Sequence, residues 1–121
     1  MLLAGLRRKE GTEPEVERTR RGVRLLQNGS VLSEVLSKPG ATDSVFDVLA
    51  AAVRLFSPGD CVGILGFAGG GMIAPLRAMG GGHKLSGVDL DRVGYDLFCD
   101  LSVKWKGEVR FAQADAVEWL R

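Results

Sequence analysis

Residues 62–82 read VGILGFAGGGMIAPLRAMGGG, a short apolar run followed by clustered glycines and then by residues that suit a helix. The apolar run at residues 61–67 is typical of a parallel strand that is buried on both faces. Residues 72–79 predict the following helix, where Pro75 is tolerated because the first turn leaves its backbone N–H groups without partners. Glycine is costly to order, so a cluster at such a junction usually lets backbone approach a ligand. The stretch therefore predicts a strand–loop–helix unit with a ligand at the loop.

The sequence after this stretch repeats the same alternation. LSGVDLD, residues 85–91, predicts a second strand that ends in acidic residues, and residues 92–104 predict a second helix. GEVRFAQAD, residues 107–115, predicts a third strand, and AVEWLR, residues 116–121, a third helix. Strands that alternate with helices in this way indicate a parallel sheet, so the predicted fold class is α/β.

A β-hairpin is predicted ahead of this alternation. Strand-like stretches at residues 23–27 and 30–36 flank Asn28 and Gly29, the dipeptide preferred where both central turn residues have positive φ. Residues 1–22 interleave arginines with glutamates and predict a charged, flexible leader rather than an arm that binds nucleic acid.

A helix is predicted between the hairpin and the first parallel strand. Pro58 and Gly59 end it, and the candidates for its N-cap are Thr42, Asp43 and Ser44. Apolar residues at helical spacing fall on one face, which is expected to cover a sheet. They are Val45, Val48, Leu49, Ala52 and Phe56.

Composition restricts the function classes. The 121 residues suit one small globular domain, and 45% of them are hydrophobic and 26% charged. The net charge of +1 gives no reason to expect nucleic acid or an anionic membrane as a partner, and no apolar run is long enough to span a membrane. Cys61 and Cys99 lack metal-ligand spacing, so we expect two buried free thiols in a reducing cytoplasm. No motif places a nucleophile beside His83, the single histidine.

The order of the glycines and acids favours a nucleoside cofactor. A phosphate loop is excluded because no Lys-Ser or Lys-Thr follows the glycines, and Ala68 makes the match to the dinucleotide motif loose. Asp89 ends the second strand, where a carboxylate can accept hydrogen bonds from both ribose hydroxyls. Asp115 follows the third strand, where a carboxylate could accept from an adenine amino group.

GILGFAGGG, GVDLD and QADAVEWL together resemble the cofactor-binding half of the S-adenosylmethionine-dependent methyltransferases. With the preceding hairpin and helix, residues 23–121 are similar to the spermidine synthase branch of that superfamily. The resemblance implies a Rossmann-like half-sheet that binds S-adenosylmethionine or its decarboxylated form. It also implies a reaction in which a small-molecule acceptor attacks a carbon attached to the sulfonium.

The resemblance carries over to named positions. Asp89 would hold the ribose, Leu90 would pack on the adenine, and Asp115 with Ala116 would contact the adenine edge. An alternative role for Asp115 is the N-cap of the helix that begins at Ala116. The glycine loop would line the methionine and sugar parts of the cofactor through Gly66, Phe67, Ala68, Gly69, Gly70 and Gly71.

The chain also departs from the spermidine synthase pattern. Gly69 and Leu32 stand where that branch has an aspartate and a glutamine, and apolar residues replace two polar positions of its polyamine site. The family's further strands and its catalytic aspartate have no counterpart, so the catalytic residue is unknown. We therefore expect residues 60–121 to be an incomplete cofactor-binding portion with an open sheet edge that pairs with another copy or segment. Two alternatives stay open, a non-catalytic, dimerising interaction protein of the same fold and a nicotinamide-binding domain.

Overall fold

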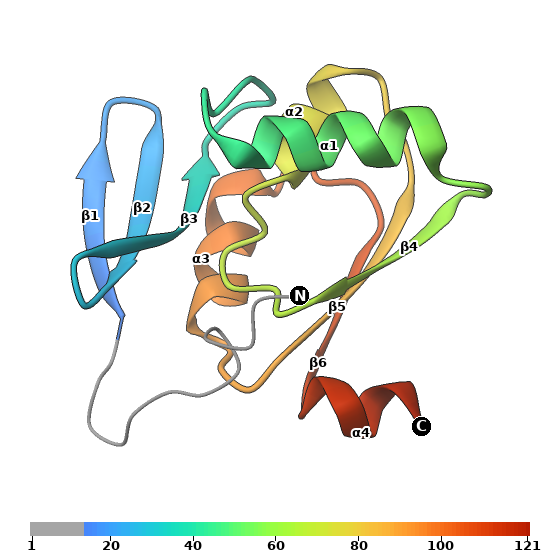
Figure 1. Cartoon of the computed structure of the whole chain (residues 1–121). Helices are drawn as coiled ribbons and strands as arrows, with labels where there is room; N and C mark the ends of the chain where they lie inside the picture. The colour runs from blue at the N-terminus through green and yellow to red at the C-terminus, as the bar shows by residue number, and fades with distance from the viewer. Residues whose placement is uncertain (1–13) are drawn as a thin grey trace.

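The computed structural model describes residues 14–121, which form two sheets with helices between and around them (Figure 1). The first sheet is antiparallel with strand order β1-β2-β3, and the second is parallel with order β4-β5-β6. The elements are β1 (Glu15–Thr19), β2 (Gly22–Gln27), β3 (Ser30–Leu36), α1 (Val45–Phe56), β4 (Cys61–Leu65), α2 (Ile73–Ala78), β5 (Lys84–Asp89), α3 (Val93–Ser102), β6 (Val109–Gln113) and α4 (Ala116–Leu120). The predicted α/β fold, with a hairpin and a helix ahead of three parallel strands, is confirmed.

The hairpin turn follows its predicted chemistry. Asn28 and Gly29 have φ of 51° and 77°, so both central residues take the left-handed conformation of a type I′ turn. The prediction of a flexible leader is wrong for Glu15–Thr19, which pairs antiparallel with β2. Most side chains of this strand are exposed, so the strand is held by its backbone hydrogen bonds to β2. Its sequence, EVERT, has no apolar alternation from which a strand could be predicted. Residues 1–13 lie outside the described residues.

Helix α1 forms where it was predicted, but it turns a different side to the core. Ser44 is the N-cap, and its Oγ accepts from the Phe46 N–H at 3.4 Å. The side that packs inward carries Phe46, Ala50 and Val53. The predicted inward face of Val45, Val48, Leu49, Ala52 and Phe56 is exposed instead. Helix α1 is apolar on two sides, and its narrower side packs against α2 and joins the core that includes Val35 of the hairpin.

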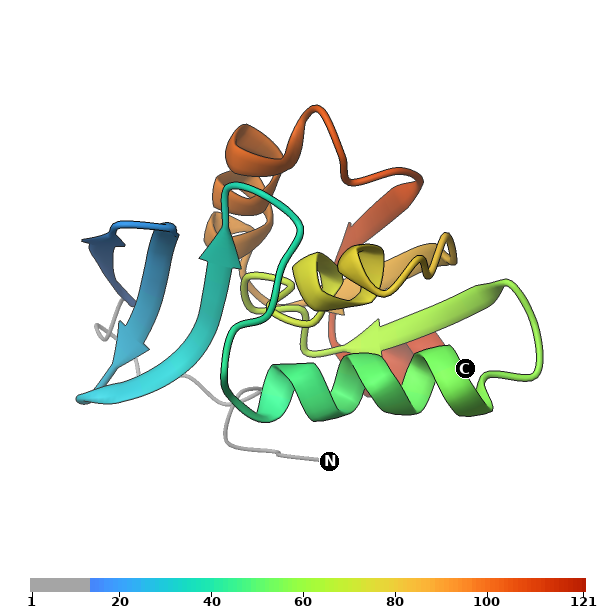
Figure 2. The ribbon, with the colours of Figure 1, turned by 90° about the horizontal axis from the view of Figure 1, so that it is seen from above.

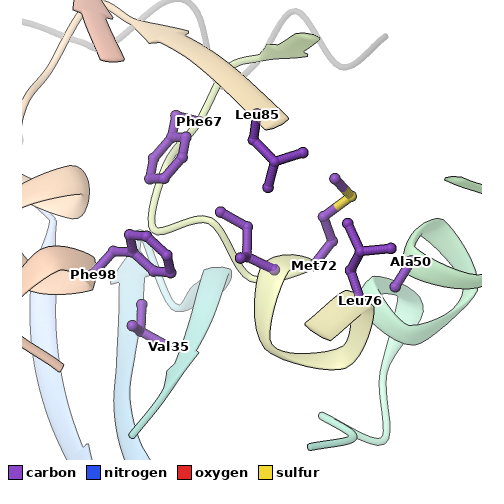
Figure 3. Packing of buried hydrophobic residues seen from close by; sticks show 8 residues of the cluster. Val35, Ala50, Phe67, Met72, Leu76, Leu85 and Phe98 are labelled. Atoms are coloured by element: carbon purple, nitrogen blue, oxygen red, sulfur yellow. The ribbon is translucent and has the colours of Figure 1, made fainter. Parts of the chain in front are cut away.

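One hydrophobic core joins the two sheets (Figure 3). Side chains from β3, α1, the loop after β4, α2, β5 and α3 converge there. Its buried members are Val35, Ala50, Phe67, Met72, Ile73, Leu76, Leu85 and Phe98. The hairpin and α1 are therefore packed against the parallel sheet rather than attached to it by a linker.

Strand β4 is less buried than its sequence predicted. It pairs with β5 and forms an edge of the described sheet, so Cys61 and Gly63 are exposed and the rest of the strand is half-buried. Both cysteines are free, but the prediction that they are buried is wrong for Cys61, and Cys99 is half-buried. No helix within residues 14–121 is long and apolar enough to cross a membrane.

Candidate functional site

The glycine loop leaves the carboxyl end of β4 and turns at once toward β5. The N–H groups of Gly66 and Phe67 both donate to the Val88 carbonyl, at 2.9 and 3.0 Å. Gly66 and Gly70 have φ of 76° and 65°, and Ala68, although not a glycine, has φ of 49°. Three left-handed residues in five make the loop tight, so its backbone is presented close to the end of the sheet.

Asp89 ends β5 and anchors this loop. Its side chain is 6% exposed, and its Oδ2 accepts from the Ala68 N–H at 2.7 Å. Its Oδ1 accepts from the Asp91 N–H at 3.3 Å. The carboxylate thus bridges the loop after β4 and the turn after β5. A carboxylate has about four lone-pair sites, so these two bonds leave two unused on a residue that is largely buried.

The underside of the loop is packed against the chain's own hairpin. A Cβ at Gly69 would lie 2.7 Å from Val35 Cγ2, and one at Gly71 would lie 2.9 Å from Ser33 Oγ. Gly69, Gly70 and Gly71 are all buried. These glycines therefore allow close packing between the loop and β3, and a ligand would reach the loop from its other side.

Ser33 is a residue at this site that the sequence did not single out. Its side chain is buried, and its hydroxyl has no hydrogen-bond partner among the described residues. The sequence of β3, SVLSEVL, has no strict alternation of polar and apolar residues, so it does not predict that the Ser33 hydroxyl is turned toward a glycine loop. Only the three-dimensional packing of β3 on the loop reveals it.

Phe67 belongs to the core rather than to an open binding surface. Its ring is 2% exposed and makes edge-to-face contacts with Tyr95, Phe98 and Phe111, at centroid distances of 5.5 to 5.7 Å. Tyr95 and Phe111 stack at 4.5 Å, and the Arg92 guanidinium lies over both rings. A ligand at the loop would therefore meet the half-buried Gly66 and Ala68 rather than Phe67.

A hydrogen bond to the Cys99 thiol, together with burial, raises the pKa of Tyr95. The phenol therefore stays neutral at physiological pH, and it contributes a ring and an uncharged hydroxyl to this cluster. Cys99 also accepts from the Lys106 ammonium at 3.6 Å, which ties α3 to the segment before β6.

The ends of β5 and β6 are tied together beside this loop. The Ala114 N–H donates to the Asp89 carbonyl at 2.9 Å, and Gln113 Nε2 donates to the Leu90 carbonyl at 3.1 Å. Leu90 is exposed, as its predicted packing on an adenine requires, whereas Ala116 is buried. The whole Ala116 residue is 1% exposed, so its predicted contact with the adenine edge has almost no open surface.

Asp115 is the N-cap of α4, which confirms one of its two predicted roles. Its Oδ1 accepts from the N–H groups of Val117 and Glu118, at 2.8 and 3.2 Å. The residue is exposed, so its carboxylate is also open to a ligand. Its contact with an adenine stays a prediction.

Two grooves lie away from these strand ends. The larger, of about 340 Å³, runs between the hairpin and the start of α1 and is lined in part by Arg24, Glu34, Ser44 and Phe46. Glu34 is not a free anion there, because its Oε1 lies 2.7 Å from Arg24 Nη2. The smaller, of about 190 Å³, lies between α1 and α2. Neither groove is lined by the predicted cofactor residues.

Within residues 14–121, no three His, Cys, Asp or Glu side chains gather in a way that could hold a metal ion.

No protein-family model matches this chain, and a search of curated proteins finds no match either. The candidate site therefore consists of the glycine loop, Asp89, Leu90 and Asp115, three segments brought together at the carboxyl ends of neighbouring parallel strands.

Proposed function

We infer that this chain is the cofactor-binding portion of a transferase that resembles spermidine synthases and S-adenosylmethionine-dependent methyltransferases. The observation that carries the proposal is the convergence of the glycine loop, Asp89 and Asp115 at the carboxyl ends of β4, β5 and β6. In open parallel sheets, that end of the strands is where ligands bind. The ligand would be S-adenosylmethionine or its decarboxylated form.

Each part of the site has a physical task in this proposal. The free lone pairs of Asp89 would accept from the ribose hydroxyls while the same carboxylate keeps its bond to the Ala68 N–H. The exposed side chain of Leu90 would pack on the adenine, and Asp115 would accept from its amino group. The half-buried backbone of Gly66 and Ala68 would face the sugar and the methionine portion.

Catalysis of the transfer step would come chiefly from the alignment of the acceptor with the sulfonium of the cofactor. A nucleophile of a small-molecule acceptor would attack a carbon attached to the sulfonium, and the cofactor supplies the reactive group. The proposal assigns no catalytic residue and covers both methyl and aminopropyl transfer. A polyamine acceptor has little support at the hairpin groove, because the Glu34 carboxylate is already neutralised by Arg24.

Calorimetric titration of the full chain tests the proposal. The ligands are S-adenosylmethionine, its decarboxylated form, S-adenosylhomocysteine and a nicotinamide dinucleotide. Asp89→Asn keeps an oxygen that can accept from the Ala68 N–H but removes the charge that would bind both ribose hydroxyls. Asp115→Ser keeps an N-cap but is too short to reach an adenine. Asp96→Asn, which removes an exposed carboxylate on α3, is the matched control.

Saturable binding of an S-adenosyl compound that weakens at least tenfold in both site variants, and not in Asp96→Asn, supports the proposal. Binding of the dinucleotide alone would favour the nicotinamide alternative. The absence of binding to all four ligands by a folded chain would overturn the cofactor role. Preference between the two S-adenosyl donors would distinguish aminopropyl from methyl transfer.

A second candidate function is a non-catalytic interaction protein of the same fold that forms dimers or pairs along its sheet edge. The exposure of the apolar side of α1 favours it, since such a surface is unusual on a protein that acts alone. Under either candidate we place the protein in the cytoplasm, because a free, exposed thiol such as Cys61 suits a reducing compartment.

A further inference from the structure

The most apolar side of α1 faces away from the protein. Five of its large apolar side chains are 48 to 79% exposed, and with Ala52 they form a continuous stripe around the helix. The stripe consists of Val45, Val48, Leu49, Ala52, Leu55 and Phe56. An amphipathic helix normally buries such a stripe, so its exposure indicates a surface that another chain covers.

The stripe lies on the open side of the parallel sheet. Two polar side chains of α1 point toward α2. Asp47 lines the groove between α1 and α2 together with Pro75, and Arg54 Nε donates to the carbonyl of Met79, which follows α2, at 3.3 Å. The stripe is on the opposite side of the helix. Seen from above, α1 lies on the side of β4 that faces away from β5 (Figure 2), and Figure 1 shows that it lies above the strand.

Strand β4 offers an unprotected edge beside this stripe. Its sequence is CVGIL, without a charge or a proline, and in the described sheet it pairs with β5 alone. Such an edge presents unpaired backbone N–H and C=O groups to a further strand. The other edge differs, because the exposed Arg110 lies in β6.

Helix α4 adds apolar surface on β4. The Trp119 ring packs on Gly63, where an added Cβ would lie 3.7 Å from the indole. Val117, Trp119 and Leu120 are exposed. Apolar side chains from two helices thus flank the open edge.

We propose that this surface is the interface of a two-fold symmetric dimer, in which β4 of one copy pairs antiparallel with β4 of another and the α1 stripes pack together. The dimer specifies the partner left open in the proposed function, and it does not depend on cofactor binding. With the axis at Gly63, Cys61 of one copy lies opposite Leu65 of the other. The two sheets then form one continuous sheet of six strands, and the pairing closes on itself.

A second copy is the occupant that charge and area favour. The stripe and β4 carry no charged residue, so self-pairing brings no like charges together. The exposed side chains of the stripe present on the order of 300 Å² and those of α4 about 150 Å², taking roughly 100 Å² for a large apolar side chain. A standard interface buries about 800 Å² per partner, so this smaller area fits a weak dimer that backbone pairing along β4 completes. Pairing of β4 with β6 of another copy would meet Arg110 and would not close.

Sedimentation equilibrium of the full chain, from low to high micromolar concentration, tests the dimer. We expect a monomer–dimer equilibrium that Val48→Asp and Leu55→Glu each weaken about 100-fold, because the symmetry repeats a tenfold effect at two sites. Both side chains are exposed, so the monomer should fold unchanged. The matched control is Val31→Asp on the hairpin, where the valine is also exposed, and it should leave the equilibrium unchanged.

Thiol labelling with a maleimide tests the strand pairing separately. The exposed Cys61 should react more slowly as dimer forms, while the half-buried Cys99 serves as the internal reference. A chain that stays monomeric overturns the proposal and assigns the surface to a different partner. A dimer that tolerates Val48→Asp, or a Cys61 rate that does not change with concentration, also overturns it. Cofactor titration of the monomeric Val48→Asp chain shows independently whether the proposed function holds.

Discussion

The chain contains two glycine triplets, and their surroundings are opposite. The first, at residues 69–71, is buried beneath the hairpin and α1, and a Cβ added anywhere in it would press on a neighbouring side chain. The second, at residues 80–82, is largely open, and an added Cβ at Gly80 or Gly82 would meet nothing within 4 Å. All three glycines of the first triplet are thus tightly packed, whereas in the second only the central Gly81 is, with an added Cβ 2.5 Å from Leu76 Cδ1.

A single half-buried arginine explains why the open triplet still has one shape. Arg77 Nη1 donates to the carbonyls of Gly81 and His83, both at 2.8 Å, and its Nε donates to the Lys106 carbonyl at 2.8 Å. Burial lowers the pKa of Arg77, but the guanidinium stays charged at physiological pH. The second loop is therefore held by hydrogen bonds to its carbonyls, whereas the first is held by side-chain contacts from the hairpin, α1 and Phe67.

Gly94→Ala tests that tight packing most severely. Gly94 lies in the first turn of α3, and an added Cβ would overlap the carbonyl oxygen of Ala68 in the glycine loop. Helix propensity alone predicts a gain of about 1 kcal/mol. Because the clash is with backbone, we expect instead a loss of about 3 kcal/mol or more in the free energy of unfolding, measured by urea denaturation.

The control for this variant is Gly59→Ala, since Gly59 has open space around it and is not left-handed. That chain should unfold within about 1 kcal/mol of the original. A Gly94→Ala chain as stable as the original would mean that α3 does not pack on the loop as described.

Gly70→Ala and Gly80→Ala form a matched pair across the two triplets. Both glycines are left-handed, with φ of 65° and 79°, so both variants bear a backbone cost of about 1 kcal/mol. Only at Gly70 would the new Cβ also press on the Phe67 ring, at 2.7 Å from Cζ. We expect a total loss of about 2 to 3 kcal/mol for Gly70→Ala and about 1 kcal/mol for Gly80→Ala.

The difference between the two unfolding free energies measures the packing of the first triplet alone. Equal losses in the two variants would mean that the Phe67 ring moves aside at no cost. The first triplet would then resemble the second, and the contrast between them would disappear.

The prediction of the fold from sequence succeeded where the signal was local, and for the candidate site the same holds of the N-cap role of Asp115. Strand–helix alternation, the Asn28-Gly29 turn and the cap of α4 by Asp115 all follow from short patterns, and the structure has each of them. Burial was harder to predict because it depends on distant segments. The sequence cannot show that Ser33 of the hairpin lies on the glycine loop, or that Ala68 is the partner of Asp89.

The inward side of α1 was mispredicted for the same reason. Periodicity identifies the widest apolar side of a helix and assumes that the core lies there. In this chain the core takes the side of Ala50, and the wider stripe with Phe56 is left exposed. Similarly, β1 (Glu15–Thr19) forms through backbone pairing with β2, which leaves no apolar signal in its own sequence.

Asp89→Ala should have a smaller effect on stability than the substitutions in the tight contacts. It leaves the Ala68 N–H without its acceptor, and a half-buried donor without a partner costs about 1 to 2 kcal/mol. Asp89→Asn retains an acceptor oxygen and should lose less. Hydrogen exchange at the Ala68 amide, measured by NMR, should accelerate in the alanine variant, and unchanged exchange would remove Asp89 as the anchor of the loop.

Gly82→Ala should have the smallest effect, and one of opposite sign. Gly82 has open space where a Cβ would be, and its backbone is not left-handed, so alanine fits without strain. Alanine has fewer conformations than glycine in the unfolded chain, and we expect a gain of about 0.4 to 1 kcal/mol by urea denaturation. A clear loss would mean that residue 82 also needs to be glycine for the loop to keep its bonds to Arg77. A gain here beside a loss at Gly70 would establish that the two triplets differ in packing and not in composition.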